Sequence, residues 1–240
     1  NDPEAQYNLG YIYYEDKYVS RDINKAIHYL TLASDQDNCI AQKVLGDIYI
    51  SGKSIPRDID KSIHYYTLAS SQGNVVAQYS LGFIYYNSGD IKKALHYFLL
   101  AANQNHNESL FVLGMSYYYG KYVPQDIDKG LHYLSLAANG NFSLAQYNLG
   151  YIYHKGEHVR TDINKAIFYY KLAANQNHAN AQNELGHIYL NIQFDINKAI
   201  HYLSLAADRN ISSAQYDLGL IYYKDKYVSR DINKAIHYFT

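Results

Sequence analysis

The sequence predicts an all-α fold: a solenoid built from about seven copies of one helix-turn-helix unit. The dipeptide Leu-Gly recurs seven times, at intervals of about 36 residues. The tetrapeptide Asp-Ile-x-Lys follows each Leu-Gly pair. Apolar residues around both motifs repeat with the period of an amphipathic helix. A single helix pair cannot bury its apolar face, whereas stacked copies can, so the repeat predicts a solenoid.

The seven copies are expected to form one solenoid domain over residues 1–240. Their approximate ranges are 1–36, 37–72, 73–104, 105–140, 141–176, 177–209 and 210–240. The third and sixth copies are shorter because they lack residues between the glycine and the aspartate. Loops tolerate such deletions, so a loop is expected there. The first and last copies resemble the internal ones instead of forming polar caps, which suggests a fragment of a longer chain.

The first helix of each copy, helix A, contains the Leu-Gly pair. In the first copy Ala5, Leu9, Ile12 and Tyr13 lie at i, i+4, i+7 and i+8, so they share one face. A glycine inside a helix costs about 1 kcal/mol relative to alanine. Because Gly10 recurs in all seven copies, we expect a close helix crossing that offsets this cost.

The second helix, helix B, begins after the recurring aspartate. In the first copy Asp22 is expected to be the N-cap, since a short acceptor side chain satisfies free N–H groups of the first turn. Ile23, Ala26 and Leu30 then belong to the apolar stripe. The helix is expected to end in a polar turn at 35–38.

Composition argues against several classes of protein. With 21 Lys and Arg against 22 Asp and Glu, the net charge is −1, so no nucleic-acid or anionic-membrane partner is expected. No apolar run is long enough for direct membrane insertion. Cys39 is the only cysteine and therefore cannot form an internal disulfide. The unpaired cysteine and the absence of a signal-peptide pattern favour a cytoplasmic location.

No motif predicts catalysis, and neither a cofactor nor a metal is expected. His154 and His158 have the spacing of helical metal ligands, but Gly156 lies between them and no third ligand is near. The segment 52–54 reads Gly-Lys-Ser, but Asp47 stands where a phosphate-binding loop needs its first glycine. A column of six histidines, beginning with His28, is predicted to face solvent in the B helices.

The repeated pattern A-x-Y-x-L-G-x-x-Y followed by D-x-x-K-A resembles the Sel1-like repeat, a relative of the tetratricopeptide repeat. The fifth copy carries it most fully, from Ala145 to Ala174. The resemblance implies a right-handed α–α superhelix. It also implies a non-catalytic scaffold or adaptor for protein complexes, with a protein or peptide partner. The alternative is a regulatory or substrate-docking region of a larger enzyme, such as a protist protein kinase. The resemblance also implies the lumen of the endoplasmic reticulum as the alternative to a cytoplasmic location.

The face of helix A opposite the apolar stripe holds the candidate partner contacts. They form two columns, one directly after the Leu-Gly glycine and one three residues later. The candidates are Tyr11, Asp47, Phe83, Met115, Tyr151 and His187 in the first column, and Tyr14, Tyr86 and Tyr118 in the second. These side chains either pack against the next copy or line a concave groove that binds a peptide. The sequence leaves both alternatives open.

Overall fold

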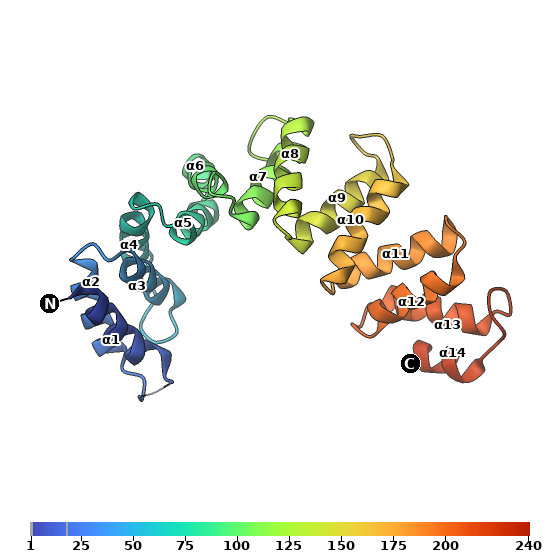
Figure 1. Cartoon of the computed structure of the whole chain (residues 1–240), viewed down its shortest axis with the longest axis horizontal. Coiled ribbons are helices and arrows are strands. Elements are labelled where there is room, and N and C mark those ends of the chain that lie inside the picture. Colours follow the sequence, from blue (N-terminus) through green and yellow to red (C-terminus); the bar gives the residue numbers. More distant parts are fainter. Residues whose placement is uncertain (1, 18) are drawn as a thin grey trace. The chain divides into compact units, whose positions relative to one another are not determined.

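The computed structural model describes residues 2–17 and 19–240, and within these residues it contains fourteen α-helices and no strand. A and B helices alternate along the chain (Figure 1). The A helices are α1 (Pro3–Glu15), α3 (Cys39–Ser51), α5 (Val75–Ser88), α7 (Asn107–Tyr119), α9 (Ser143–Lys155), α11 (Ala179–Asn191) and α13 (Ser212–Tyr223). The B helices are α2 (Ile23–Ser34), α4 (Ile59–Ser71), α6 (Ile91–Ala102), α8 (Ile127–Asn139), α10 (Ile163–Asn175), α12 (Ile196–Ala207) and α14 (Ile232–Phe239). The predicted all-α repeat fold is confirmed.

The chain forms two compact units, Asn1–Leu113 and Gly114–Thr240. In the first unit α2 packs on both α1 and α3, and α4 packs on both α3 and α5. In the second unit each helix from α9 to α13 likewise contacts the helix before it and the helix after it. The apolar face of each pair is therefore buried by its neighbours, as a solenoid requires.

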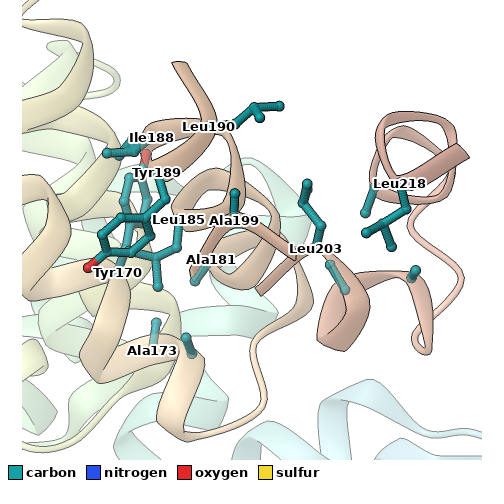
Figure 2. Close-up of a cluster of buried hydrophobic side chains, with 14 of the residues drawn as sticks. Tyr170, Ala173, Ala181, Leu185, Ile188, Tyr189, Leu190, Ala199, Leu203 and Leu218 are labelled. Atoms are coloured by element: carbon teal, nitrogen blue, oxygen red, sulfur yellow. The ribbon is translucent and has the colours of Figure 1, made fainter. Parts of the chain in front are cut away.

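The core of the second unit shows which side chains fill these contacts. Tyr170, Leu185, Leu203 and Leu218 are buried together and come from four consecutive helices, α10 to α13 (Figure 2). Fully buried alanines such as Ala181 lie between them. Small side chains let the helix axes approach each other, which accounts for the recurring alanine positions in the sequence.

The predicted N-caps are confirmed in all seven B helices. Asp162, for example, accepts a hydrogen bond from the backbone N–H of Lys165 at 2.9 Å. The ammonium of Lys165 lies 4.9 Å from the ring centroid of Tyr153, and Tyr153 stacks on Tyr169 at 5.9 Å. The same lysine–tyrosine–tyrosine arrangement recurs in every copy. The Asp-x-x-Lys motif and two tyrosine columns thus form one structural cluster.

The close crossing predicted at the Leu-Gly glycines is also confirmed. A Cβ atom on Gly114 would lie 2.7 Å from Leu134 Cγ and 2.9 Å from the Leu134 backbone nitrogen. A Cβ on Gly150 would lie 2.6 Å from the Tyr170 ring. Each glycine therefore admits a large side chain of helix B directly onto the backbone of helix A.

Each of the six polar turns between copies contains a left-handed residue just after its B helix. Asn141 has φ 63° and Asp37 has φ 61°, whereas the second copy uses Gly73 with φ 84°. Asparagine, aspartate and glycine tolerate this conformation better than other residues do. Gly52 has φ 63° and ends α3, so the Gly-Lys-Ser segment follows a helix and not a strand.

Glutamines on the A helices link the polar ends of successive B helices by hydrogen bonds, a feature that the sequence did not predict. Gln146 is buried on α9, and its Nε2 donates to the backbone oxygen of Ala138 at 3.0 Å. Its Oε1 accepts a hydrogen bond from Gln176 Nε2 at 2.7 Å. Equivalent glutamine pairs occur in three other copies: Gln6 with Gln36, Gln42 with Gln72, and Gln78 with Gln104.

Candidate functional site

The second column of helix A mostly packs between copies. Tyr14 packs against the core around Leu30 and Leu45, and Leu190, which occupies the same position in the sixth copy, is buried in the core of the second unit. Tyr118 is 0% exposed, and its ring lies edge-on to Tyr119 and His158. A fully buried ring cannot contact a partner, so the prediction of Tyr118 as a contact residue is wrong for this conformation. Tyr86 is half-buried.

The first column is more accessible. Phe83 is 51% exposed, and the other candidates in this column, Tyr11, Asp47, Met115, Tyr151 and His187, are half-buried. Tyr11 lies beside Tyr7 and Tyr14, with ring centroids 5.7 and 6.3 Å away. A hydrogen bond to Glu15 raises the pKa of Tyr11. This column therefore forms the accessible part of the outward face, by which we mean the face of helix A opposite the apolar stripe.

Phe83 borders an apolar recess in the first unit. The recess measures about 260 Å³ and is lined by Ile50, Tyr66, Tyr79, Ser80, Phe83 and Ile84. The ring of Tyr79 lies 6.3 Å from that of Phe83 and 5.9 Å from that of Phe98. Helices α3, α4 and α5 thus hold a half-exposed aromatic side chain beside a hollow large enough for a side chain of another molecule.

Asp47 is held within the first unit by two neighbours. Its Oδ1 accepts a hydrogen bond from the Tyr66 hydroxyl at 2.7 Å, and its Oδ2 lies 2.6 Å from the ammonium of Lys43. Burial is the main cause of the raised pKa of Tyr66, and the negative charge of the Asp47 carboxylate raises that pKa further. The Asp47 carboxylate is thus paired inside the chain.

In the second unit, histidines and carboxylates from successive A helices face each other. His154 Nδ1 lies 3.5 Å from Glu184 Oε2, and His187 Nδ1 lies 3.3 Å from Asp217 Oδ2. The pKa of Glu184 is lowered, chiefly by His154. The pKa of Asp217 is raised by burial, which outweighs the opposite effect of His187. Sequence reasoning missed Glu184 and Asp217, although both stand two residues before the recurring glycine.

We expect Asp217→Asn to raise the melting temperature by about 2 °C at pH 8, where histidine is ordinarily neutral. Because the pKa of Asp217 is raised in the folded state, ionisation above the ordinary value of 3.8 reduces stability, and asparagine avoids this loss. The gain should disappear below that value. Thermal melts at pH 8 and pH 3.5 check this, and a variant less stable than the parent at pH 8 would contradict it.

The other histidines belong to the structural framework. The B-helix histidines, including His28 and His132, are exposed as predicted and pack beside the neighbouring tyrosine. His154 faces Glu184, whereas His158 packs on Tyr118. Within residues 2–17 and 19–240 no group of three or more His, Cys, Asp or Glu residues is placed to hold a metal ion. Among the same residues, no helix combines the length and the hydropathy needed to cross a membrane.

Comparisons with known proteins agree with this arrangement. The Sel1 repeat pattern matches residues 3–38, 40–74, 107–142, 143–178, 179–211 and 212–240. The chain belongs to the Sel1 repeat family. Residues 79–107 of this Sel1 repeat chain match a tetratricopeptide repeat, which accounts for the third copy. No curated protein matches the sequence.

Solved structures share the fold over nearly the whole chain. The chain is 28% identical to c5321, a protective antigen of uropathogenic Escherichia coli, with a TM-score of 0.83 over 99% of this chain and 52% of that one. It is 30% identical to a Sel1 repeat protein from Oxalobacter formigenes, with a TM-score of 0.82 over 92% of this chain and 66% of that one. The Pseudomonas aeruginosa immunity protein PA5088 shares the fold alone. It is 19% identical, with a TM-score of 0.51 over 84% of this chain and 78% of that one.

Proposed function

We propose that this Sel1 repeat chain is a non-catalytic scaffold that binds a protein or peptide segment in a groove along the outward face of its A helices. The observation that carries the proposal is Phe83, 51% exposed beside the apolar recess of the first unit. Aromatic side chains next to a pocket are typical energetic centres of protein interfaces. Adaptor function is common for repeats of this kind, which present a continuous surface built from successive copies.

The contact surface that we propose follows the first column. In the first unit it comprises Tyr11, Asp47 and Phe83, with Tyr14 and Tyr86 of the second column at their edge, and in the second unit it comprises Met115, Tyr151 and His187. Aromatic residues and methionine are enriched in protein interfaces, and lysine and glutamate are depleted. Variation along this column, from aromatic to acidic to histidine, would let each copy recognise a different side chain of the partner.

We further propose the cytoplasm as the compartment. Cys39 is a free thiol, with its sulfur 3.7 Å from the backbone oxygen of Ala69. Free thiols persist in reducing compartments, whereas oxidising compartments favour disulfides.

We expect Phe83→Ala to weaken binding of a peptide selected on the chain by about tenfold, the equivalent of 1.4 kcal/mol. Peptides are selected from a random library on the unmodified chain, and dissociation constants are then measured by fluorescence anisotropy. Phe168→Ala is the matched control, because Phe168 is 57% exposed in the histidine column of the B helices. Equal losses for the two variants, or no loss for Phe83→Ala, would contradict the proposed site.

A triple variant separates binding from packing along the column. Alanine at Tyr11, Phe83 and Tyr151 together should reduce partner binding while the helicity measured by circular dichroism stays near that of the parent. A variant that melts far earlier would show that these aromatics serve the fold instead.

A further inference from the structure

The apolar recess beside Phe83 lies between two side chains that are small for their positions. Ile50 on α3 stands at a position that holds tyrosine in the first, third, fourth and seventh copies. Ser80 on α5 is smaller than the asparagine, valine, glutamate or aspartate that every other copy has at its position. Both side chains line the recess. The hollow of about 260 Å³ is therefore a feature of the sequence of these two copies.

The second unit shows that these two positions face each other across neighbouring copies. His154 on α9 corresponds to Ile50, and Glu184 on α11 corresponds to Ser80. The two side chains meet, with His154 Nδ1 3.5 Å from Glu184 Oε2. Longer side chains thus occupy, in one unit, the space that isoleucine and serine leave open in the other.

The walls of the recess favour an apolar occupant. The buried Tyr66 hydroxyl already donates to Asp47 at 2.7 Å, and the rings of Tyr79 and Phe83 lie 6.3 Å apart. Within residues 2–17 and 19–240, none of the buried side-chain polar atoms without a hydrogen-bond partner belongs to the recess. A polar occupant would therefore lose its hydration without compensation. Because a cavity of about 150 Å³ holds benzene, the recess has room for leucine, methionine or phenylalanine.

An exposed carboxylate, that of Glu108, borders the recess. The ring centroid of Tyr79 lies 4.7 Å from that of His106, and His106 Nε2 lies 3.5 Å from Glu108 Oε2. Burial raises the pKa of Tyr79, and the negative charge of Glu108 raises that pKa further. The Glu108 side chain is 47% exposed, so a partner in the recess can reach it.

The charges around the recess favour a positively charged partner. The other nearby carboxylate, Asp47, is neutralised by Lys43 at 2.6 Å. Glu108 has no lysine or arginine within ion-pair distance among residues 2–17 and 19–240. The first unit as a whole has nine Lys and Arg against twelve Asp and Glu. Complementary charge increases the rate of encounter and helps to fix the register of a bound segment.

We propose that the partner segment binds the first unit through one large apolar side chain, inserted into the recess beside Phe83, and a lysine or arginine within two positions of it, placed beside Glu108. The inference rests on the proposed scaffold function and specifies the chemistry of the partner at that site. Two residues of an extended segment span about 7 Å, which matches the short path from Tyr79 through His106 to Glu108. Burial of the apolar side chain supplies most of the affinity, and the charge orients the segment.

The test uses the whole chain, isotope-labelled at its isoleucine methyl groups, and three matched peptides. The reference peptide is acetyl-Lys-Ala-Leu-Ala-Lys-amide, which offers a basic residue on either side of the apolar one. In the second peptide asparagine, which is polar and of similar size, replaces leucine. In the third, glutamate replaces both lysines. Ile50 and Ile84 line the recess, so their methyl resonances report both the place and the affinity of binding.

We expect the reference peptide to shift the methyl resonances of Ile50 and Ile84. It should bind about tenfold more tightly than the asparagine peptide and about threefold more tightly than the glutamate peptide. Glu108→Gln should remove most of the second difference and leave the first. Equal affinities in either comparison, or shifts confined to isoleucines of the second unit such as Ile188, would overturn the proposal.

Two variants fill the recess with side chains that other copies carry at the same positions. Ile50→Tyr introduces the tyrosine of the first, third, fourth and seventh copies, and Ser80→Asn introduces the asparagine of the first and fifth copies. Both should keep the helicity of the parent by circular dichroism and bind the leucine peptide about fivefold more weakly. The asparagine peptide should bind almost as before. Full affinity for the leucine peptide in either folded variant would overturn the site, and if Ile50→Tyr does not fold, Ser80→Asn decides.

Failure of this proposal is distinguishable from failure of the scaffold proposal. Peptides selected from a random library test the scaffold function through their dependence on Phe83, whatever their sequence. If Phe83→Ala weakens them but the leucine and asparagine peptides bind equally, the groove stands and the apolar anchor fails. If Phe83→Ala leaves the selected peptides unaffected but the leucine peptide shifts Ile50 and Ile84 with the expected preference, the groove proposal fails and the chemistry of the recess stands.

Discussion

Gly114→Leu is expected to destabilise the second unit by about 3 kcal/mol or more, through overpacking of a helix crossing. A Cβ at this position would lie 2.7 Å from Leu134 Cγ and 2.9 Å from the Leu134 backbone nitrogen. A side chain can change rotamer to relieve a clash, but a backbone atom moves only with its helix. Helices α7 and α8 would therefore have to separate, which exposes apolar surface that both now bury.

The size of this effect is measured by thermal and denaturant melts. A loss of 3 kcal/mol corresponds to a fall in melting temperature of about 6–12 °C for a chain of this length. Asn180→Leu is the control, because it introduces the same leucine side chain at an exposed position of α11. Leucine has a better helix propensity than glycine by about 1 kcal/mol, so the clash at Gly114 must cost more than the net loss of unfolding free energy that is measured. A melting temperature within about 1 °C of the parent would refute the close crossing.

Gln146→Leu is expected to destabilise the chain by about 2–3 kcal/mol because it breaks a satisfied polar cluster. Gln146 is 2% exposed, donates to the Ala138 oxygen at 3.0 Å and accepts from Gln176 at 2.7 Å. Leucine fits the volume but offers neither a donor nor an acceptor. The buried Ala138 oxygen then keeps only its hydrogen bond from the Asn141 N–H, and the Gln176 amide loses its acceptor.

Gln182→Leu is the matched control for this prediction. Gln182 is 1% exposed and donates to the Ala174 oxygen at 3.3 Å, but its own Oε1 has no partner among the described residues. Its replacement should therefore destabilise the chain less than Gln146→Leu does. The fourth copy has Leu110 at this position and Gly140 at the position of Gln176, so that copy lacks both glutamines. Equal losses of unfolding free energy in the two variants would show that the second hydrogen bond contributes little.

Several features of the fold could be predicted because they depend on residues close together in the sequence. Asp22 and Lys25 are three residues apart, and the N-cap needs only that spacing. Gly10 recurs in register with Ala26 and Leu30, which predicted a close crossing inside each pair. The solvent-facing position of His28 followed from the helical period of α2 alone.

The candidate site could be predicted only in part. The period of helix A placed Phe83 on the face opposite the apolar stripe, but the recess beside it also needs Ile50 and Tyr66 from the preceding pair. Tyr118 shares the predicted outward face, yet its ring is buried against His158, which is forty positions away. Such contacts depend on how far one helix pair is offset from the next, and no local pattern encodes that offset.

The sequence by itself determined the repeat, its two helices, their caps and the glycine crossing, because each depends on periodicity and short-range geometry. Only the tertiary structure decided which outward side chains remain accessible, which glutamines are satisfied, and that His154 lies against both Tyr170 and Glu184 while Asp47 bonds to Tyr66. The physical reason is that burial and polar pairing depend on atoms brought together by stacking. Copies that share one sequence motif therefore present different chemistry on the same face.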